Sequence, residues 1–356
     1  MQVSFSKIVV AGTGGTIAGR SSVSGDNVGY RAGEVEVADL MVGLPERVHG
    51  LGALQVDAVQ VAQVDSKDMG HAVWIPLLSN LQRWLVAPEV KAVVVTHGTD
   101  TLEETAYLLS RVLPPTKPVV LTCAMRPATA LVPDGPQNLL DALSVALDAL
   151  TAGVQVVAAG WVHAARHISK VHTYRQDAFS SGDAGPVGCV EEGRVRWFGK
   201  SAEADCSPSA AGVLDSIAAG ALTSASWPRV EVVTSHSGAT GDLVDAMLMQ
   251  ANGPRPLRGL VVAGTGNGTL HHELEAALHR AQQAGVVVWR TSRCAFGQVV
   301  GSVDVPSDCT GAIRTLLPPL RCTDPAHLPA SALSPVKARI ALMLQLMERR
   351  PIAGGH

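Results

Sequence analysis

A threonine in a glycine-rich segment near the start of the chain is the first residue placed to do chemistry. Thr16 lies in AGTGGTIAGRSS, residues 11–22, directly after the apolar run KIVV. Glycines at such a turn let the backbone bend sharply and point N–H groups into a cleft, which is how an oxyanion is held. The Thr16 hydroxyl is therefore a candidate nucleophile, provided that a base removes its proton.

Phosphate binding is the alternative use of the same glycines, and two of its sequence patterns fail here. The P-loop pattern requires a lysine where the chain has Arg20, and arginine does not replace it. The dinucleotide fingerprint requires Gly or Ala where the chain has Ile17. The polar, Gly-rich stretch that follows is a poor helix and is typical of a mobile lid.

Further polar groups follow other apolar runs. Thr99 and Asp100 end KAVVVTHGTD, Ser66 begins the connection in QVDSKDMG, and Lys170 lies in the polar loop ARHISKVHTYRQDAF. Together with Thr16 they fit amide hydrolysis by a threonine nucleophile, with a lysine of lowered pKa as the base. Each also has a structural alternative, namely a helix cap at Asp100, a turn at Ser66 and a solvated charge at Lys170.

Short Val-rich runs that alternate with helical patterns must position these side chains. The expected strands of the first part of the chain cover residues 7–12, 54–61, 91–98, 118–124 and 154–163. Apolar residues recur at helical spacing over residues 71–85, 101–113 and 136–150. The alternation predicts a doubly wound α/β domain, whose ligands bind at the carboxyl ends of the strands. A capping-box pattern, Thr101 with Glu104, predicts that the second helix starts there.

The alternation breaks around residues 191–227, where a small, polar stretch is typical of a linker. It resumes with expected strands at 230–235, 259–266 and 285–291, expected helices at 241–251 and 270–285, and a closing helix at 334–350. We therefore expect two doubly wound α/β domains. The larger covers residues 1–200, a linker covers 201–228, and a smaller, flavodoxin-like C-terminal domain covers 229–356.

Composition excludes several classes of protein. The 356 residues carry a formal net charge of −3, so no basic field indicates nucleic acid or a membrane surface as a partner. We find no apolar run of about 18 residues and no signal peptide, and we expect a cytoplasmic protein, with the periplasm as the alternative. The six cysteines lack CxxC spacing, which favours free thiols, although a Cys309–Cys322 bridge fits an exported protein. We find no metal-ligand cluster.

Six segments resemble, in the same order, the motifs of the bacterial-type L-asparaginases, the asparaginase/glutaminase amidohydrolase family. They are TGGTIAG (13–19), DSKDM (65–69), THGTDTLEETAY (96–107), AMRPATALVPDGPQNL (124–139), SKVHTYRQDAF (169–179) and GTGNGTL (264–270). Any one of them is a weak signal, but all six in family order are highly specific. The resemblance covers most of the chain.

The resemblance implies the catalytic residues. Thr16 falls on the family's primary nucleophile, and Tyr30 looks like the lid tyrosine that hydrogen-bonds that threonine. Thr99 matches the second threonine, Lys170 the lysine paired with it, and Asp100 the carboxylate that holds the substrate α-amino group. Which threonine attacks first stays open at this point.

The resemblance also implies the substrate contacts. Ser66 resembles the residue that binds the substrate α-carboxylate, and Lys67 follows it. Ala124 resembles the backbone position near the side-chain amide. Asn267 matches a residue that the family supplies from the neighbouring subunit, in a homotetramer built from intimate dimers.

The activity implied is hydrolysis of L-asparagine to L-aspartate and ammonia through a threonine acyl-enzyme, without a cofactor. A broad-specificity glutaminase-asparaginase is the near rival, because one methylene in a pocket is worth only about 1–3 kcal/mol. An amidotransferase acting on charged tRNA should carry an appended RNA-binding domain, which we do not find. A catalytically dead amino-acid sensor would have a damaged nucleophile set.

Three positions depart from the family pattern. Family members usually carry a glutamate in the loop matching residues 290–308, where this chain has none and Asp304 is a loose candidate. Lys67 puts a cation beside Ser66, and this either alters the charge preference for substrates or points to solvent. Residues 303–335 are longer and richer in Cys and Pro than we expect.

Overall fold

The computed structural model divides the chain into two compact units, Met1–Ser224 and Ala225–His356. The structure describes residues 6–23, 25–44, 54–199, 211–250, 253–300 and 328–348, together with 46, 48 and 52. The predicted fold class, two α/β units of which the N-terminal one is larger, is confirmed.

An eight-stranded mixed sheet forms the centre of the larger unit, in the order β10-β9-β6-β5-β4-β3-β1-β2. Its parallel part consists of β1 (Lys7–Gly14), β2 (Gln55–Val64), β3 (Val90–Thr96), β4 (Val119–Thr122) and β5 (Val154–Ala158). Antiparallel strands β6 (Trp161–Ala164), β9 (Gly188–Glu191) and β10 (Arg194–Trp197) extend it at one edge. The inner parallel strands β1, β3, β4 and β5 are almost continuous runs of buried residues, because helices cover both faces, whereas the edge strand β2 is only partly buried.

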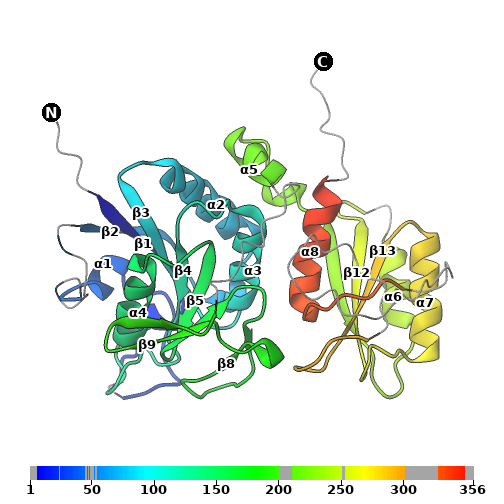
Figure 1. Ribbon diagram of the computed structural model, residues 1–356. Helices are drawn as coiled ribbons and strands as arrows, with labels where there is room; N and C mark the ends of the chain where they lie inside the picture. Colours follow the sequence, from blue (N-terminus) through cyan, green and yellow to red (C-terminus); the bar gives the residue numbers. More distant parts are fainter. Residues whose placement is uncertain are drawn as a thin grey trace. The chain divides into compact units, whose positions relative to one another are not determined.

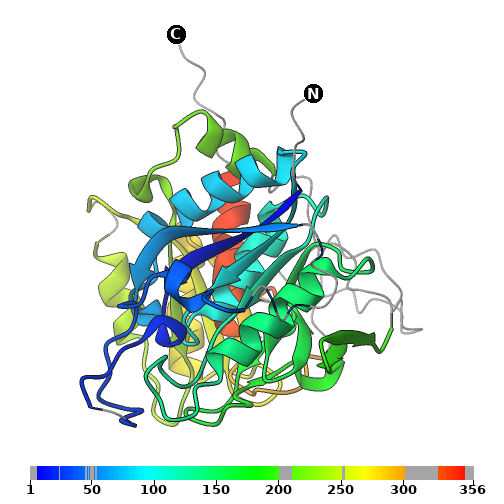
Figure 2. The ribbon, with the colours of Figure 1, turned by 90° about the vertical axis from the view of Figure 1, so that its left-hand side faces the viewer.

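Helices lie on both faces of this sheet (Figures 1 and 2). One face packs against α1 (Val37–Leu40) and α4 (Gly135–Leu147), and the other against α2 (His71–Val86) and α3 (Leu102–Val112). The core on the first face joins Ile8 and Val10 of β1 to Leu139 and Leu143 of α4, all with 1% or less of their surface exposed. This burial is the main source of stabilisation for the scaffold that carries the polar loops.

The strand order reverses direction around β1. β2 lies on one side of β1, and β3, which comes next in the chain, lies on its other side. In open α/β sheets such a reversal leaves a crevice at the carboxyl ends of the strands, where ligands bind. The turns that follow β1, β2, β3 and β4 therefore converge on one edge of the sheet.

Two expectations about the larger unit need correction. The single strand expected over 154–163 is a hairpin, because Ala159 (φ 49°) and Gly160 (φ 78°) turn the chain between β5 and β6. Part of the expected linker is helical, since α5 (Ala211–Ala218) packs against α2 and α3 through a buried apolar side. Linker residues 201–210 lie outside the described residues.

The smaller unit is built on three parallel strands in chain order, β11 (Arg229–Thr234), β12 (Leu257–Gly264) and β13 (Val287–Ser292). The crossover helices α6 (Asp242–Leu248) and α7 (His272–Gln283) pack with the buried side chains of one face. The closing helix α8 (Pro335–Glu348) packs on the strands too, and Leu342 lies against Gly259 of β12. Within its described residues this unit has fewer strands than a flavodoxin-like sheet.

Two further expectations from the sequence concern the membrane and the cysteines. In the described part of the chain, no helix has the length and apolar character needed to cross a bilayer. Cys123, Cys189 and Cys294 are free thiols. Cys309 and Cys322 lie outside the described residues, so their pairing stays a prediction.

A buried carboxyl group on α4 leads to a prediction about stability. Asp141 is 4% exposed, and burial raises the pKa of its carboxyl to about 6, although a hydrogen bond from Gln137 opposes the shift. Because the folded pKa exceeds the unfolded one, the folded protein gives up stability as the pH rises from about 4 to 6 and does not regain it above. D141N removes this penalty, so we expect it to be more stable than the wild type by about 3 kcal/mol at pH 7. Urea unfolding of both proteins at pH 4 and pH 7 checks this, and an equal difference at both values would contradict it.

Candidate active site

A tight turn at the end of β1 presents the Thr16 hydroxyl. The short 3-10 helix Thr16–Ala18 follows Gly14 (φ 101°) and Gly15 (φ 82°), backbone conformations that favour glycine. The Gly15 N–H donates to the Val64 carbonyl at the end of β2 (2.8 Å). The turn is thus tied to the neighbouring strand, and Thr16 is held at the carboxyl edge with 8% of its surface exposed.

Three turns meet at this edge because glycines allow their backbones to touch. A Cβ on Gly15 would collide with the backbone of Gly98, and a Cβ on Gly98 would lie 2.5 Å from the Ser66 Oγ. Between them, the buried imidazole of His97 donates from Nδ1 to the Gly98 carbonyl (2.7 Å). Burial lowers the pKa of His97 to about 4, so this ring is neutral at physiological pH. The turns after β1, β2 and β3 therefore form one contiguous surface.

The phenol of Tyr30 contacts the Thr16 hydroxyl directly. The two oxygen atoms lie 2.6 Å apart, and the Tyr30 ring packs against Gly19, where a Cβ would lie 2.7 Å from it. The segment that carries Tyr30 is tied back to the Thr16 turn, for example by the Glu34 N–H to the Ala18 carbonyl (2.8 Å). Burial raises the pKa of the Tyr30 phenol, so it stays protonated and can exchange hydrogen bonds with Thr16.

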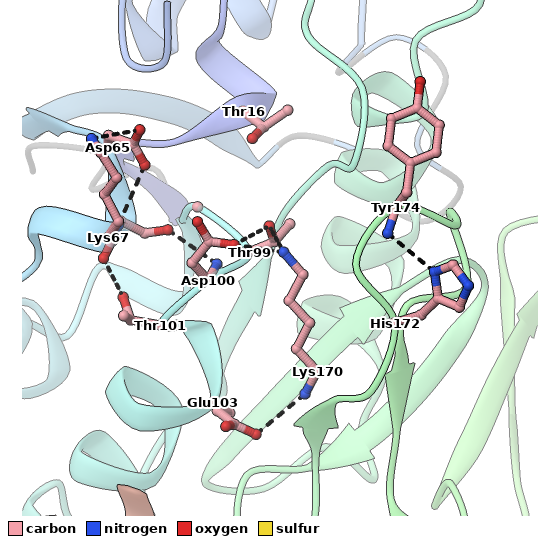
Figure 3. A network of polar contacts seen from close by, with 12 residues as sticks. Thr16, Asp65, Lys67, Thr99, Asp100, Thr101, Glu103, Lys170, His172 and Tyr174 are labelled. Atoms are coloured by element: carbon pink, nitrogen blue, oxygen red, sulfur yellow. Dashed lines mark hydrogen bonds and ion pairs between the residues drawn. The ribbon is translucent and has the colours of Figure 1, made fainter. Parts of the chain in front are cut away.

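A second group joins Thr99, Asp100 and Lys170 (Figure 3). The Lys170 Nζ donates to the Thr99 Oγ1 (2.8 Å) and to the Asp100 Oδ1 (2.6 Å). The Lys170 side chain is 18% exposed and that of Asp100 is 52% exposed, so the carboxylate remains open to a ligand. Figure 3 places Thr16 on the same side as this group, with its side chain directed toward Thr99 and Asp100.

The sequence did not single out Glu103, which anchors the lysine loop. Lys170 lies in the short strand β7 (Ser169–Lys170), which pairs with β8 (Phe179–Ser180) outside the main sheet. The Lys170 backbone N–H donates to the Glu103 Oε2 on the first turn of α3 (3.2 Å). Glu103 directly follows the segment THGTDTL, and this position was the signal that could have indicated its role. The capping-box pattern pointed to Glu104 instead.

The start of α3 confirms the predicted boundary but not the predicted cap. The helix begins at Leu102 with Thr101 as its N-cap residue, and no side-chain cap bond is made there. Instead the Thr101 hydroxyl donates to the Ser66 carbonyl (2.8 Å). The Ser66 Oγ in turn accepts the Asp100 N–H (3.1 Å). These bonds hold the turn after β2 to the turn after β3, so tertiary contacts replace the local cap.

Lys67 lies beside Ser66 with its side chain 61% exposed. Its ammonium bonds Asp68 (2.8 Å) and Asp65 (2.9 Å), and these carboxylates raise the pKa of Lys67. The lysine is therefore charged and paired with these two carboxylates, and a contact between Lys67 and the substrate stays a prediction.

Of the remaining predicted residues, Ala124 belongs to the larger unit and Asn267 to the smaller one. Ala124, 1% exposed, follows β4 and packs in an apolar cluster with Ile17. Asn267 belongs to the smaller unit, where its amide bonds both the N–H (2.6 Å) and the carbonyl (3.0 Å) of Val300. Asp304 lies outside the described residues.

Comparison with known proteins shows which family the chain belongs to. Residues 7–203 match the family model "Asparaginase, N-terminal", and residues 229–353 match "Glutaminase/Asparaginase C-terminal domain". The chain belongs to the asparaginase family. The predicted resemblance is thereby confirmed over both units.

Asparaginase relatives match along most of the chain. The glutaminase-asparaginase of Pseudomonas fluorescens biotype A is 32% identical over 85% of this chain and 80% of its own length. L-asparaginase 2 of Bacillus subtilis is 32% identical over 95% of this chain and 82% of its own length. The crystal structure of a probable cytoplasmic L-asparaginase from Campylobacter jejuni superposes with a TM-score of 0.78 at 32% identity, covering 96% of this chain and 95% of that one.

Proposed function

We propose that this asparaginase-family chain is an L-asparagine amidohydrolase that works through a threonine acyl-enzyme. The observation that carries the proposal is the convergence of Thr16–Tyr30 and Thr99–Asp100–Lys170 on the carboxyl edge of one sheet. Relatives that match 85% and 95% of the chain are named glutaminase-asparaginase and L-asparaginase 2, which supports the substrate class.

Recognition of the substrate follows from its charges. An amino-acid amide is a zwitterion with a neutral side chain, so it needs a carboxylate for its ammonium group and donors for its own carboxylate. The half-exposed carboxylate of Asp100 suits the ammonium group. The Ser66 hydroxyl and nearby backbone N–H groups suit the carboxylate. The peptide groups around Ala124 are assigned to the side-chain amide.

The reaction is an acyl transfer in two halves. The Thr16 oxygen forms a bond to the amide carbon while its proton passes to the Tyr30 oxygen and the Tyr30 phenol gives its own proton to the amide nitrogen. The C–N bond then breaks, and ammonia leaves with Tyr30 protonated as before. A water molecule next attacks the acyl-enzyme, releases L-aspartate and restores the Thr16 hydroxyl. The bonded pair Thr99–Lys170 is assigned to proton transfer in these steps.

Ammonia release is the deciding measurement. The purified protein is incubated separately with L-asparagine and L-glutamine at neutral pH, and we expect fast release from asparagine with glutamine far slower. Comparable rates would identify the broad-specificity alternative that the Pseudomonas fluorescens relative's name suggests. Release from neither amide would overturn the proposed function, and amino-acid binding would then test a sensor.

Assembly and compartment are part of the same proposal. A homotetramer made of two dimers would let the smaller unit, which carries Asn267, complete a neighbour's site, and light scattering measures this mass directly. We further propose a cytoplasmic location, with the periplasm as the alternative. The free thiols of Cys123, Cys189 and Cys294 support a reducing compartment. The names of similar proteins include both compartments: the Campylobacter jejuni enzyme is named a probable cytoplasmic L-asparaginase, and a Haemophilus influenzae relative is named a probable periplasmic one.

A further inference from the structure

The N-terminal end of α4 carries a carboxylate that bonds a loop instead of its own helix. Asp134 is the N-cap residue of α4, yet it makes no side-chain cap bond. Its Oδ2 accepts the Met125 N–H (2.9 Å) and its Oδ1 accepts the Arg126 N–H (2.9 Å). Both carboxylate oxygens thus hold the chain just after β4, and helix capping does not account for this residue.

One helical turn further along α4, Asn138 bonds the chain just before this segment, at Cys123, and also the turn after β5. Its Nδ2 donates to the Cys123 carbonyl (2.9 Å), and its Oδ1 accepts the Ala159 N–H (3.0 Å). Asn138 is 4% exposed, so neither bond competes with bulk water. Replacing one partner would leave buried polar groups unsatisfied, which costs more than the bond itself contributes.

These bonds enclose a single residue, Ala124. The Cys123 carbonyl and the Met125 N–H flank it, so α4 holds the peptide groups before and after it. The same helix end also packs on the turn that carries Thr16: a Cβ on Gly135 would lie 2.9 Å from the Ile17 Cγ1. Ile17 and Ala124 lie in one buried apolar cluster. The end of α4 therefore sets the position of Ala124 relative to Thr16.

We infer that Asp134 and Asn138 are positioning residues that hold the Ala124 main chain where it aligns the substrate amide with the Thr16 hydroxyl. The inference rests on the proposed function, which places the side-chain amide at Ala124. The α-ammonium and α-carboxylate groups of the substrate are bound elsewhere, at Asp100 and Ser66. Loosening the loop should therefore slow the chemical step and leave the binding of those two groups intact.

Two conservative variants test the inference. D134N can accept only one of the two loop N–H groups, and N138D loses the donor to the Cys123 carbonyl. For each we expect kcat with L-asparagine to fall by about 10- to 100-fold, since small misplacements of reacting groups have effects of this size. The inhibition constant of the product L-aspartate, which lacks the amide, should change by less than about threefold. D141N is the matched control, because it lies on the same helix and bonds Gln137, away from the loop.

The outcomes separate this inference from the proposed function. A wild type that releases ammonia, with both variants matching D141N in kcat, would overturn the inference alone. Loss of kcat together with weaker L-aspartate binding, in proportion to a lower melting temperature, would also overturn it, because that is a general loss of structure. A wild type that releases no ammonia from either amide would overturn both. Two variants on separate helical turns keep the test decisive if one of them fails to fold.

Discussion

Replacing Thr16 by alanine is expected to lower kcat with L-asparagine by roughly four orders of magnitude or more, the scale seen when a hydrolase loses its nucleophile. The substitution removes the hydroxyl that bonds the Tyr30 phenol and leaves the glycine-built turn in place. Folding should therefore be nearly unchanged. Ammonia release measures the rate, and thermal unfolding of the same preparation measures the stability.

The matched control at this position is T16S, which keeps the hydroxyl and should recover a large part of the rate. Mass spectrometry of rapidly quenched wild type should find the acyl group on the peptide that contains residue 16. Near-normal turnover by T16A would remove Thr16 from the mechanism and make Thr99 the nucleophile. The sequence alone left that choice open.

Replacing Lys170 by methionine is expected to lower kcat with L-asparagine by about a thousandfold, within the range of a lost general base. Methionine keeps most of the stem but removes the bonds to the Thr99 hydroxyl (2.8 Å) and the Asp100 carboxylate (2.6 Å). KM should change less than kcat, because Asp100 still offers its carboxylate to the substrate ammonium group. Steady-state kinetics of ammonia release separates the two constants.

K7M is the control for this prediction. Lys7 also bonds a carboxylate, Asp57 (2.9 Å), but at the opposite end of β1 from Thr16, so its loss should leave kcat unchanged. K170R distinguishes charge from proton transfer, because a guanidinium stays protonated and cannot act as a base. If K170R restores the rate, Lys170 acts through its charge and the assignment to proton transfer is wrong.

The sequence alone determined the order and type of most elements and indicated which turns carry the candidate site residues. Val-rich runs and helical spacing predict the alternating pattern, because both depend on which side chains face the core. Thr16 and Thr99 each end such a run, so their place at the carboxyl edge followed without coordinates. The glycine-rich turn that carries Thr16 was also visible, because Gly14 (φ 101°) and Gly15 (φ 82°) adopt backbone conformations that favour glycine.

Only the tertiary structure decided which partners those side chains take. Local pattern suggested that Thr101 caps α3, yet its hydroxyl reaches the Ser66 carbonyl, 35 residues away in sequence. Asp134 is likewise the N-cap residue of α4, and both its oxygens hold the loop after β4. A hydroxyl or carboxylate near a helix start can serve the helix or a neighbouring loop. Spacing along the chain cannot separate these uses, because the choice depends on which backbone groups the fold brings within hydrogen-bonding distance.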